Sequence, residues 1–236
     1  MARDVAVILA AAGKSTRFRD PFSKKVFTLC SGKPVWQHSA QLFADHPRVA
    51  QIIMAIAPED KETVQEKFAG NLTMLGVELV LGGNERFESI RNALQRVKPN
   101  LSLVAIHDAA RPCLTRASID DVLAVADRKK AAILAAPIRG TVKRCKSDDS
   151  IEQTVERAGL WQAQTPQVFS LEILQKSYAR VKGTPTDDSQ VVEEAGYSVY
   201  CVEGPESNIK ITTKGDLKIA ESFLKVPAKT KDNPFF

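Results

Sequence analysis

The feature of this sequence that most constrains its fold is an alternation of short apolar runs with helical patterns. The apolar runs, each short enough for one buried strand, lie at 5–9, 52–57, 77–81, 103–106 and 132–136. Between them, residues 85–97 and 117–126 place apolar side chains three or four positions apart, a spacing typical of amphipathic helices. Strands and helices that alternate in this way form right-handed βαβ units. We therefore expect an α/β fold with a mainly parallel sheet that helices flank on both faces.

Residues 137–164 interrupt this alternation. They are polar and carry β-branched residues on both sides of the Lys-Ser-Asp-Asp-Ser sequence at 146–150, a pattern that predicts a β-hairpin. Because a lone two-stranded ribbon has marginal stability in water, we expect a protruding β-hairpin arm at 137–160 that packs against another surface, such as a second subunit. Further elements are expected downstream: helices near 170–181, 187–195 and 214–224, and a strand at 198–202.

Composition describes an ordinary globular chain. Its 236 residues suffice for one sizeable core, so we expect a single domain over 1–236 with a flexible tail at 226–236. No apolar run approaches the roughly 18 residues of a membrane span, and no basic leader precedes a long apolar stretch. The four cysteines are far apart without a C-x-x-C pair, which argues against a zinc site and favours the reduced thiols of a cytoplasmic protein.

The net charge of +5 raises the question of nucleic-acid binding. Basic residues are interleaved with acidic ones, aromatic residues make up only 6% of the chain, and no nucleic-acid-binding motif is present. The surplus of positive charge therefore favours a small anionic substrate, and we expect neither nucleic acid nor membrane as a partner.

The loop after the first apolar run suits a phosphate chain. Small residues and Gly13 allow backbone N–H groups to approach a ligand, and Lys14, Arg17 and Lys25 add positive charge. The alternative is an ordinary turn with solvated lysines. Gly13-Lys14-Ser15 imitates the end of a P-loop, but position 8, where the first glycine of that motif would fall, is Ile8.

Two further loops carry residues suited to phosphate chemistry. Asp108 follows an apolar strand and is placed to hold Mg²⁺, while Arg111 is placed to bind an anionic oxygen. An Asp–Arg ion pair that only caps the loop is the alternative. In the other loop, two glycines at 82–83 precede a helix start at which Ser89 offers a donor.

The reaction type follows from what these loops contain. The sequence shows cations and one carboxylate but no nucleophile–base pair, and His107 is as well explained as a structural hydrogen-bonding group. Phosphoryl and nucleotidyl transfer fit this set, because positioning and charge neutralisation supply most of the catalysis. An attacking phosphate monoester is already ionised near neutral pH and needs no base.

Seven motifs occur in the order found in one family. They are Ala11-Ala12-Gly13 through Arg17, Lys25-Val26-Phe27-Thr28-Leu29 before Gly32-Lys33-Pro34, Gly82-Gly83-Asn84-Glu85-Arg86, His107-Asp108-Ala109-Ala110-Arg111-Pro112, Leu160-Trp161 with Thr165-Pro166-Gln167, Thr186-Asp187-Asp188, and Asn208-Ile209-Lys210-Ile211-Thr212. With these motifs the chain resembles the 2-C-methyl-D-erythritol 4-phosphate cytidylyltransferase family over nearly its whole length. The resemblance implies a Rossmann-like sheet, a homodimer formed partly through the hairpin arm, and Mg²⁺-dependent transfer of a cytidylyl group from CTP to methylerythritol phosphate.

The resemblance also implies roles for individual residues. The nucleotide site would comprise Ala11, Ala12, Gly13, Gly83, Asn84 and Ser89. The residues implied in catalysis are Arg17, Lys25, Asp108 and Lys210, of which Asp108 would also bind Mg²⁺. The residues implied in binding methylerythritol phosphate are Arg111 and Thr141 together with Lys210, and Arg157 and Thr186 reaching in from the partner subunit.

The sequence departs from the usual family pattern at five positions, which are Ala10, Ser15, Val26, Asn84 and Gly140. Ser15 replaces a glycine and must adopt the backbone angle of that glycine, or the loop shifts. Two other functions fit the same motifs: a cytidylyltransferase for ribitol 5-phosphate or another polyol phosphate, and a nucleotide-binding regulator without catalysis.

Overall fold

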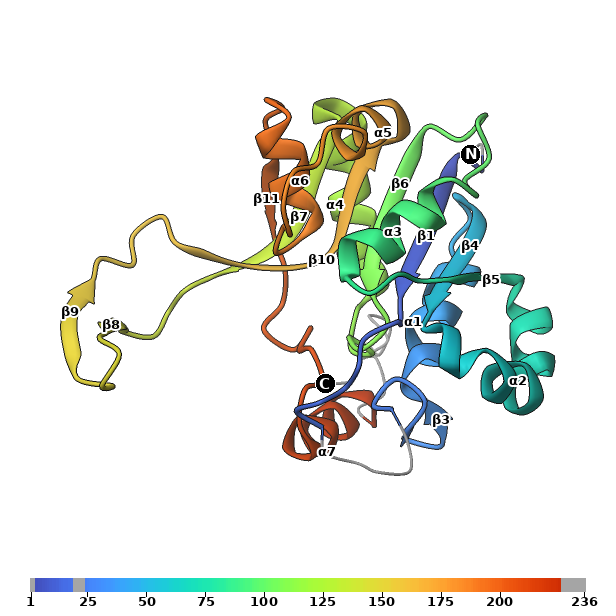
Figure 1. Ribbon diagram of the computed structural model, residues 1–236, viewed down its shortest axis with the longest axis horizontal. Coiled ribbons are helices and arrows are strands. Elements are labelled where there is room, and N and C mark those ends of the chain that lie inside the picture. Colours follow the sequence, from blue (N-terminus) through green and yellow to red (C-terminus); the bar gives the residue numbers. More distant parts are fainter. Residues whose placement is uncertain (1–2, 19–23, 226–236) are drawn as a thin grey trace, which may run out of the picture.

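A computed structural model describes residues 3–18 and 24–225 of the chain. The strands of the central sheet are β1 (Val5–Ala10), β4 (Val49–Ile56), β5 (Val77–Leu81), β6 (Leu103–Asp108), β7 (Ala131–Pro137), β10 (Trp161–Ser170) and β11 (Tyr200–Glu203). Their order across the sheet is β11-β7-β10-β6-β1-β4-β5 (Figure 1). All neighbours are parallel except β10, which runs antiparallel to both β6 and β7. The predicted mainly parallel α/β sheet is confirmed.

Helices cover both faces of this sheet (Figure 1). They are α1 (Val35–Ala44), α2 (Lys61–Leu75), α3 (Arg86–Leu94), α4 (Arg116–Lys129), α5 (Leu171–Tyr178), α6 (Asp188–Glu194) and α7 (Lys214–Leu224), with a short 3₁₀ helix η1 (Pro58–Asp60). Alternate side chains of β1 divide between two cores, because successive strand residues point to opposite faces. Val5, Val7 and Leu9 pack with α1, α2 and α4, whereas Ala6 and Ile8 pack with α3, α5 and α6.

A third, smaller core lies beyond the carboxyl ends of the central strands. It joins α7 to the hairpin of β2 (Leu29–Cys30) and β3 (Lys33–Pro34), with Ala220 packed among Cys30, Val35 and Ile211. The hairpin turn places Ser31 at φ 47° and Gly32 at φ 82°, and a tight two-residue turn between antiparallel strands needs this left-handed backbone. This core holds α7 against the edge of the sheet at which the loops gather.

The predicted hairpin is present as β8 (Val142–Cys145) and β9 (Ile151–Val155), paired antiparallel and far from the central sheet (Figure 1). The polar region 137–164 contains more than this hairpin, because the expected arm at 137–160 is followed by Trp161, the first residue of β10, a strand that the sequence analysis did not predict. The sequence Gln-Ala-Gln-Thr-Pro-Gln at 162–167 is polar and contains a proline, so it lacks the apolar run of a buried strand. The paired register of β10 shifts between Ala163 and Gln167, where this segment lies.

The final helix falls at its predicted residues, 214–224, and the expected tail at 226–236 lies outside the described residues. In the described part of the chain, no helix combines the length and apolar character needed to cross a bilayer.

Phe169 tests the role of β10 as a core strand. Its ring is fully buried among residues of the second core, so we expect Phe169→Ala to lower the free energy of unfolding by about 3–5 kcal/mol. Phe223, on the solvent side of α7 and 45% exposed, is the matched control. Phe223→Ala should change the free energy of unfolding by less than about 0.5 kcal/mol. Denaturant unfolding followed by tryptophan fluorescence measures both values, and equal losses would contradict the packing described.

Candidate active site at the carboxyl ends of the strands

Three loops meet where β1, β5 and β6 end. Ala10 pairs with Asp108 at the last position of the β1–β6 ladder, so the loops that follow these strands leave the sheet at the same level. They enclose a cavity of about 350 Å³, which we call the main cavity. Its lining comes from four chain segments and consists of Ala10–Gly13, Lys14, Thr16, Lys25, Val26, Gly83–Arg86, Ser89, Asp108, Ala110 and Lys210.

A second cavity of about 250 Å³, the side cavity, adjoins the first. It is lined by Arg86, Asp108, Arg111, Ala163, Gln164, Thr165, Gln167, Thr186, Asp187 and Lys210. Three of these residues, Arg86, Asp108 and Lys210, also line the main cavity. One acidic and two basic side chains therefore form a wall common to both cavities.

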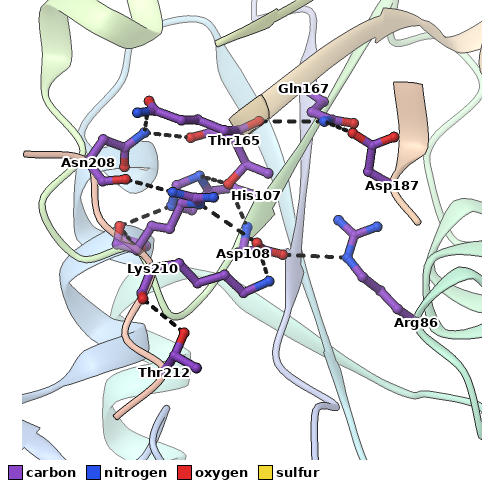
Figure 2. Close-up of polar contacts among 12 residues, drawn as sticks. Arg86, His107, Asp108, Thr165, Gln167, Asp187, Asn208, Lys210 and Thr212 are labelled. Atoms are coloured by element: carbon purple, nitrogen blue, oxygen red, sulfur yellow. Dashed lines mark hydrogen bonds and ion pairs between the residues drawn. The ribbon is translucent and has the colours of Figure 1, made fainter. Parts of the chain in front are cut away.

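Asp108 is the centre of this wall (Figure 2). Its Oδ2 lies 2.8 Å from Lys210 Nζ and 3.7 Å from Arg111 Nε, and its Oδ1 lies 3.5 Å from Arg86 Nε. Burial by itself would raise the pKa of this carboxyl, but Arg86, Lys210 and Arg111 hold it well below its usual value. Asp108 is therefore ionised throughout the neutral range.

His107 is a structural residue in this arrangement. It is fully buried, with Nε2 3.2 Å from the Arg111 carbonyl oxygen and Nδ1 3.1 Å from Thr165 Oγ1 (Figure 2). Burial lowers the pKa of His107 to about 4, so the ring is neutral at pH 7. Since a carbonyl only accepts, Nε2 donates to it and Nδ1 accepts from the Thr165 hydroxyl. Of the two interpretations that the sequence allowed, the geometry favours hydrogen bonding over general-base catalysis.

Asn208 ties the loop that carries Lys210 to the rest of the site. Its buried side-chain amide donates to Gln164 Oε1 at 3.0 Å and to the Thr165 carbonyl at 2.9 Å, while its backbone carbonyl oxygen accepts from Arg111 Nη1 at 2.7 Å (Figure 2). The sequence analysis quoted Asn208 only as part of a motif and gave it no role. Through its side chain and its backbone, Asn208 thus links three separate chain segments.

The Gly82-Gly83 pair has a packing reason. A Cβ on Gly82 would lie 2.5 Å from Ser89 Oγ, and one on Gly83 would lie 2.5 Å from the Cβ of Glu88, so this turn accepts only glycine against the start of α3. Ser89 is buried, and its hydroxyl accepts from Gly83 N and donates to the Glu85 carbonyl, both at 3.1 Å. Glu85 and Glu88 form a capping box for α3.

The first loop brings Lys25 to the main cavity. Ser15 adopts φ 55°, the left-handed conformation that favours glycine, and its hydroxyl accepts from Lys25 N at 3.3 Å. Burial and the neighbouring charges of Lys210 and Arg17 lower the pKa of Lys25 to about 8. Arg17 is exposed and lies outside the lining of either cavity, yet it is near enough to Lys25 to affect its titration.

The structure brings most of the predicted site residues together. Those in the main cavity are Ala11, Ala12, Gly13, Lys25, Gly83, Asn84, Ser89, Asp108 and Lys210, and those in the side cavity include Arg111 and Thr186. The position of Thr186 differs from the expectation that it reaches in from a partner subunit, because it lines the side cavity of its own chain. Thr141 and Arg157 are exposed on the arm, where Arg157 Nη1 donates to the Arg139 carbonyl.

The acidic residues of the site bear on how a metal ion could be held there. Within residues 3–18 and 24–225, no three His, Cys, Asp or Glu residues are grouped as a metal cage. Asp108 offers a single carboxylate that faces both cavities. A lone carboxylate fits Mg²⁺, which keeps several waters and takes other ligands from substrate phosphates.

Comparison with known proteins adds to this geometry. The sequence model of the 2-C-methyl-D-erythritol 4-phosphate cytidylyltransferase family matches residues 5–226. The proteins of that name from Rhodopirellula baltica and Caldanaerobacter subterraneus are 41% and 38% identical, each over 94% of this chain and over 96% and 99% of their own lengths.

Solved structures agree. A 4-diphosphocytidyl-2C-methyl-D-erythritol synthase superposes with a TM-score of 0.79 at 29% identity, over 95% of this chain and 100% of its own. The cytidylyltransferase from Thermus thermophilus gives 0.76 at 28% identity, over 96% and 100%. Sequence and structure therefore agree that this chain belongs to the 2-C-methyl-D-erythritol 4-phosphate cytidylyltransferase family.

Proposed function

We propose that this enzyme transfers a cytidylyl group from CTP to 2-C-methyl-D-erythritol 4-phosphate and releases pyrophosphate, the activity that its family is named for. The observation that carries the proposal is the wall of Arg86, Asp108 and Lys210 that two adjoining cavities share. If one anionic substrate binds in each cavity, both substrates lie next to the cationic side chains of Arg86 and Lys210. The wall therefore offsets the repulsion between the anions where they must approach each other.

The main cavity supports the nucleotide assignment. Ala11, Ala12 and Gly13 present little side-chain bulk, so backbone N–H groups are open to a triphosphate. Lys25 and Lys210 supply positive charge to the cavity from two chain segments, and Arg17 adds to the field from outside the lining. Gly83, Asn84 and Ser89 line the same cavity from the loop after β5 and would bind the nucleoside.

The side cavity supports the assignment of the second substrate. Arg111 and Lys210 offer cationic donors for a phosphate, and Thr186 offers a hydroxyl for the polyol. In the transfer, an oxygen of the acceptor phosphate forms a bond to the α-phosphorus of CTP as the bond to the bridging oxygen breaks and pyrophosphate departs. The acceptor oxygen is already ionised, so no base is needed, in agreement with the neutral, hydrogen-bonded His107.

Asp108 is the residue that would hold Mg²⁺. When bound, Mg²⁺ neutralises phosphate charge and polarises the bond that breaks. The carboxylate is ionised at neutral pH and opens on the main cavity, as a ligand shared with a triphosphate requires.

We further propose a homodimer formed through the arm. Residues 139–162 are exposed apart from the partly buried Val142 and Val155, and they include Ile151 and Trp161, which are 62% and 41% exposed. A second copy that covers these side chains would bring Thr141 and Arg157 of one arm to the side cavity of the other subunit. A cytoplasmic location is part of the proposal, since all four cysteines are free thiols.

Pyrophosphate release tests the function directly. The purified chain is assayed with Mg²⁺ and each of the four nucleoside triphosphates, with methylerythritol phosphate, with ribitol 5-phosphate and with neither. Pyrophosphate release with the combination of CTP and methylerythritol phosphate, and with no other combination, supports the proposal. Preference for ribitol 5-phosphate, or CTP binding without pyrophosphate release, would replace it with one of the two other functions considered from the sequence.

Lys25 should contribute mainly to the transition state. As negative charge develops between the phosphates, the Lys25 ammonium interacts more strongly with it, so we expect Lys25→Ala to lower kcat by about 100- to 1000-fold with a much smaller change in CTP affinity. The pH profile provides a second measurement. Because the pKa of Lys25 is about 8, the ammonium is present below that pH and lost above it, and kcat/KM for CTP should fall as the pH rises through 8.

Lys25→Arg shows whether the alkaline fall in kcat/KM comes from Lys25 or from another titrating group. A guanidinium keeps its charge in this range, so the residual kcat/KM of the variant should fall only at higher pH. The same alkaline fall in both proteins would assign it to another group. An equal loss of CTP affinity and kcat/KM in Lys25→Ala, with kcat unchanged, would contradict the transition-state role.

Mixed dimers test the contribution of the arm. Subunits with Lys25→Ala and subunits with Arg157→Ala are each expected to be inactive alone, since every site lacks one residue. In a statistical mixture half of the dimers are mixed, and each has one intact site, so about a quarter of wild-type activity should return. Size-exclusion chromatography with light scattering verifies the dimers. Verified mixed dimers without recovered activity would place both residues in one chain's site.

A further inference from the structure

A fully buried carboxylate lies behind the shared wall and has no role in the reaction as described so far. It belongs to Asp188, the first residue of α6, whose side chain is 0% exposed. Oδ2 accepts from Arg86 Nη2 at 2.7 Å, and Oδ1 accepts from Tyr178 Oη at 2.6 Å. Both oxygens thus have a strong donor, and a carboxylate held at both oxygens has little freedom to rotate.

Arg86 connects this buried group to the site. Its side chain is 29% exposed and lines both cavities, with Nη2 on Asp188 and Nε facing Asp108 at 3.5 Å. Nη1 has no hydrogen bond or ion pair within the part of the chain that the structure describes. The guanidinium is therefore anchored at one edge and open to the cavities at another.

The charge balance shows what Asp188 contributes. If the site needed only positive charge, a carboxylate beside Arg86 would be a disadvantage, because it cancels the charge that attracts the anionic substrates. Burying it also carries a desolvation cost, which its two partners offset. What the carboxylate does provide is a fixed position for the guanidinium, and fixed donors stabilise a transition state without reorganising.

We propose that Asp188, oriented by Tyr178, is a positioning residue that holds Arg86 so that its open edge contacts the phosphate groups of both substrates during transfer. The proposal rests on the proposed cytidylyl transfer and adds two residues to it. Arg86 is then a catalytic residue, and Asp188 acts only through it. Arg86 and Asp188 are 102 residues apart in sequence, and the sequence motifs assigned a role to neither.

Asp188→Asn distinguishes the effect of Asp188 on the position of Arg86 from its effect on the charge of the site. The amide lacks the charge that anchors Arg86, so we expect kcat to fall by about 10- to 100-fold. The variant also removes one negative charge near the anionic substrates, so KM for CTP and for methylerythritol phosphate should stay the same or decrease. Tyr178→Phe keeps the charge but frees one carboxylate oxygen, and it should lower kcat by about 3- to 10-fold.

The control variant is Asp4→Asn. Asp4 precedes β1 at the opposite edge of the sheet and accepts from Arg48 Nε at 3.0 Å and Nη2 at 2.7 Å, so it is also a carboxylate held by an arginine. Thermal melting is measured for every variant. Asp4→Asn should lower Tm while kcat and KM stay at wild-type values.

A double-mutant cycle with Arg86→Gln decides whether Asp188 acts through Arg86. In that background Asp188→Asn should reduce kcat/KM by less than about threefold, because its target is already gone. An equal loss in both backgrounds, or an unchanged kcat in Asp188→Asn, would overturn the proposal. Wild-type enzyme without pyrophosphate release would instead refute the proposed function, so the two failures are distinguishable.

Discussion

The site depends on one buried carboxylate that attracts cations from three parts of the chain. Asp108 ends a central strand, and Lys210, Arg86 and Arg111 approach it from a late loop, from α3 and from its own loop. Without Asp108 these like charges would repel one another, and the loops that carry them would separate. Because three cations surround a single anion, positive charge remains for the anionic substrates of a cytidylyltransferase. The same ion cluster thus stabilises the loops and provides the field for binding.

Uncharged hydrogen bonds position the loops around this cluster without changing its charge. Neutral His107 and the Thr165 hydroxyl support the backbone at Asp108, and the amide of Asn208 joins the Lys210 loop to β10. All three hydrogen bonds are buried and none involves an ionised side chain, so they add rigidity at little electrostatic cost. The field in the cavities therefore comes from a few ionised side chains, with Asp188 behind them as a second fixed anion.

Much of the scaffold could be predicted because its signals are local. The apolar runs located the parallel strands, and the spacing of Ile90, Ala93 and Leu94 located α3. The loops that the sequence marked as suited to phosphates follow three of these strands and line one cavity. The antiparallel strand β10 was missed because its first half carries glutamines, a threonine and a proline in place of an apolar run, and Gln164, Thr165 and Gln167 line the side cavity. These polar residues form a strand because β10 pairs with β6 and β7, although the sequence pattern had indicated part of a hairpin.

The sequence by itself determined the α/β class, the loops suited to phosphates, and the family, because strand periodicity, small residues and motif order are properties of neighbouring positions. Only the tertiary structure decided that His107 is a neutral hydrogen-bonding residue, that Thr186 lines the cavity of its own chain, and that Arg86 is anchored by Asp188. The reason is physical. Burial, pKa and ion pairing depend on which distant segments pack against each other, and a local sequence pattern does not specify that packing.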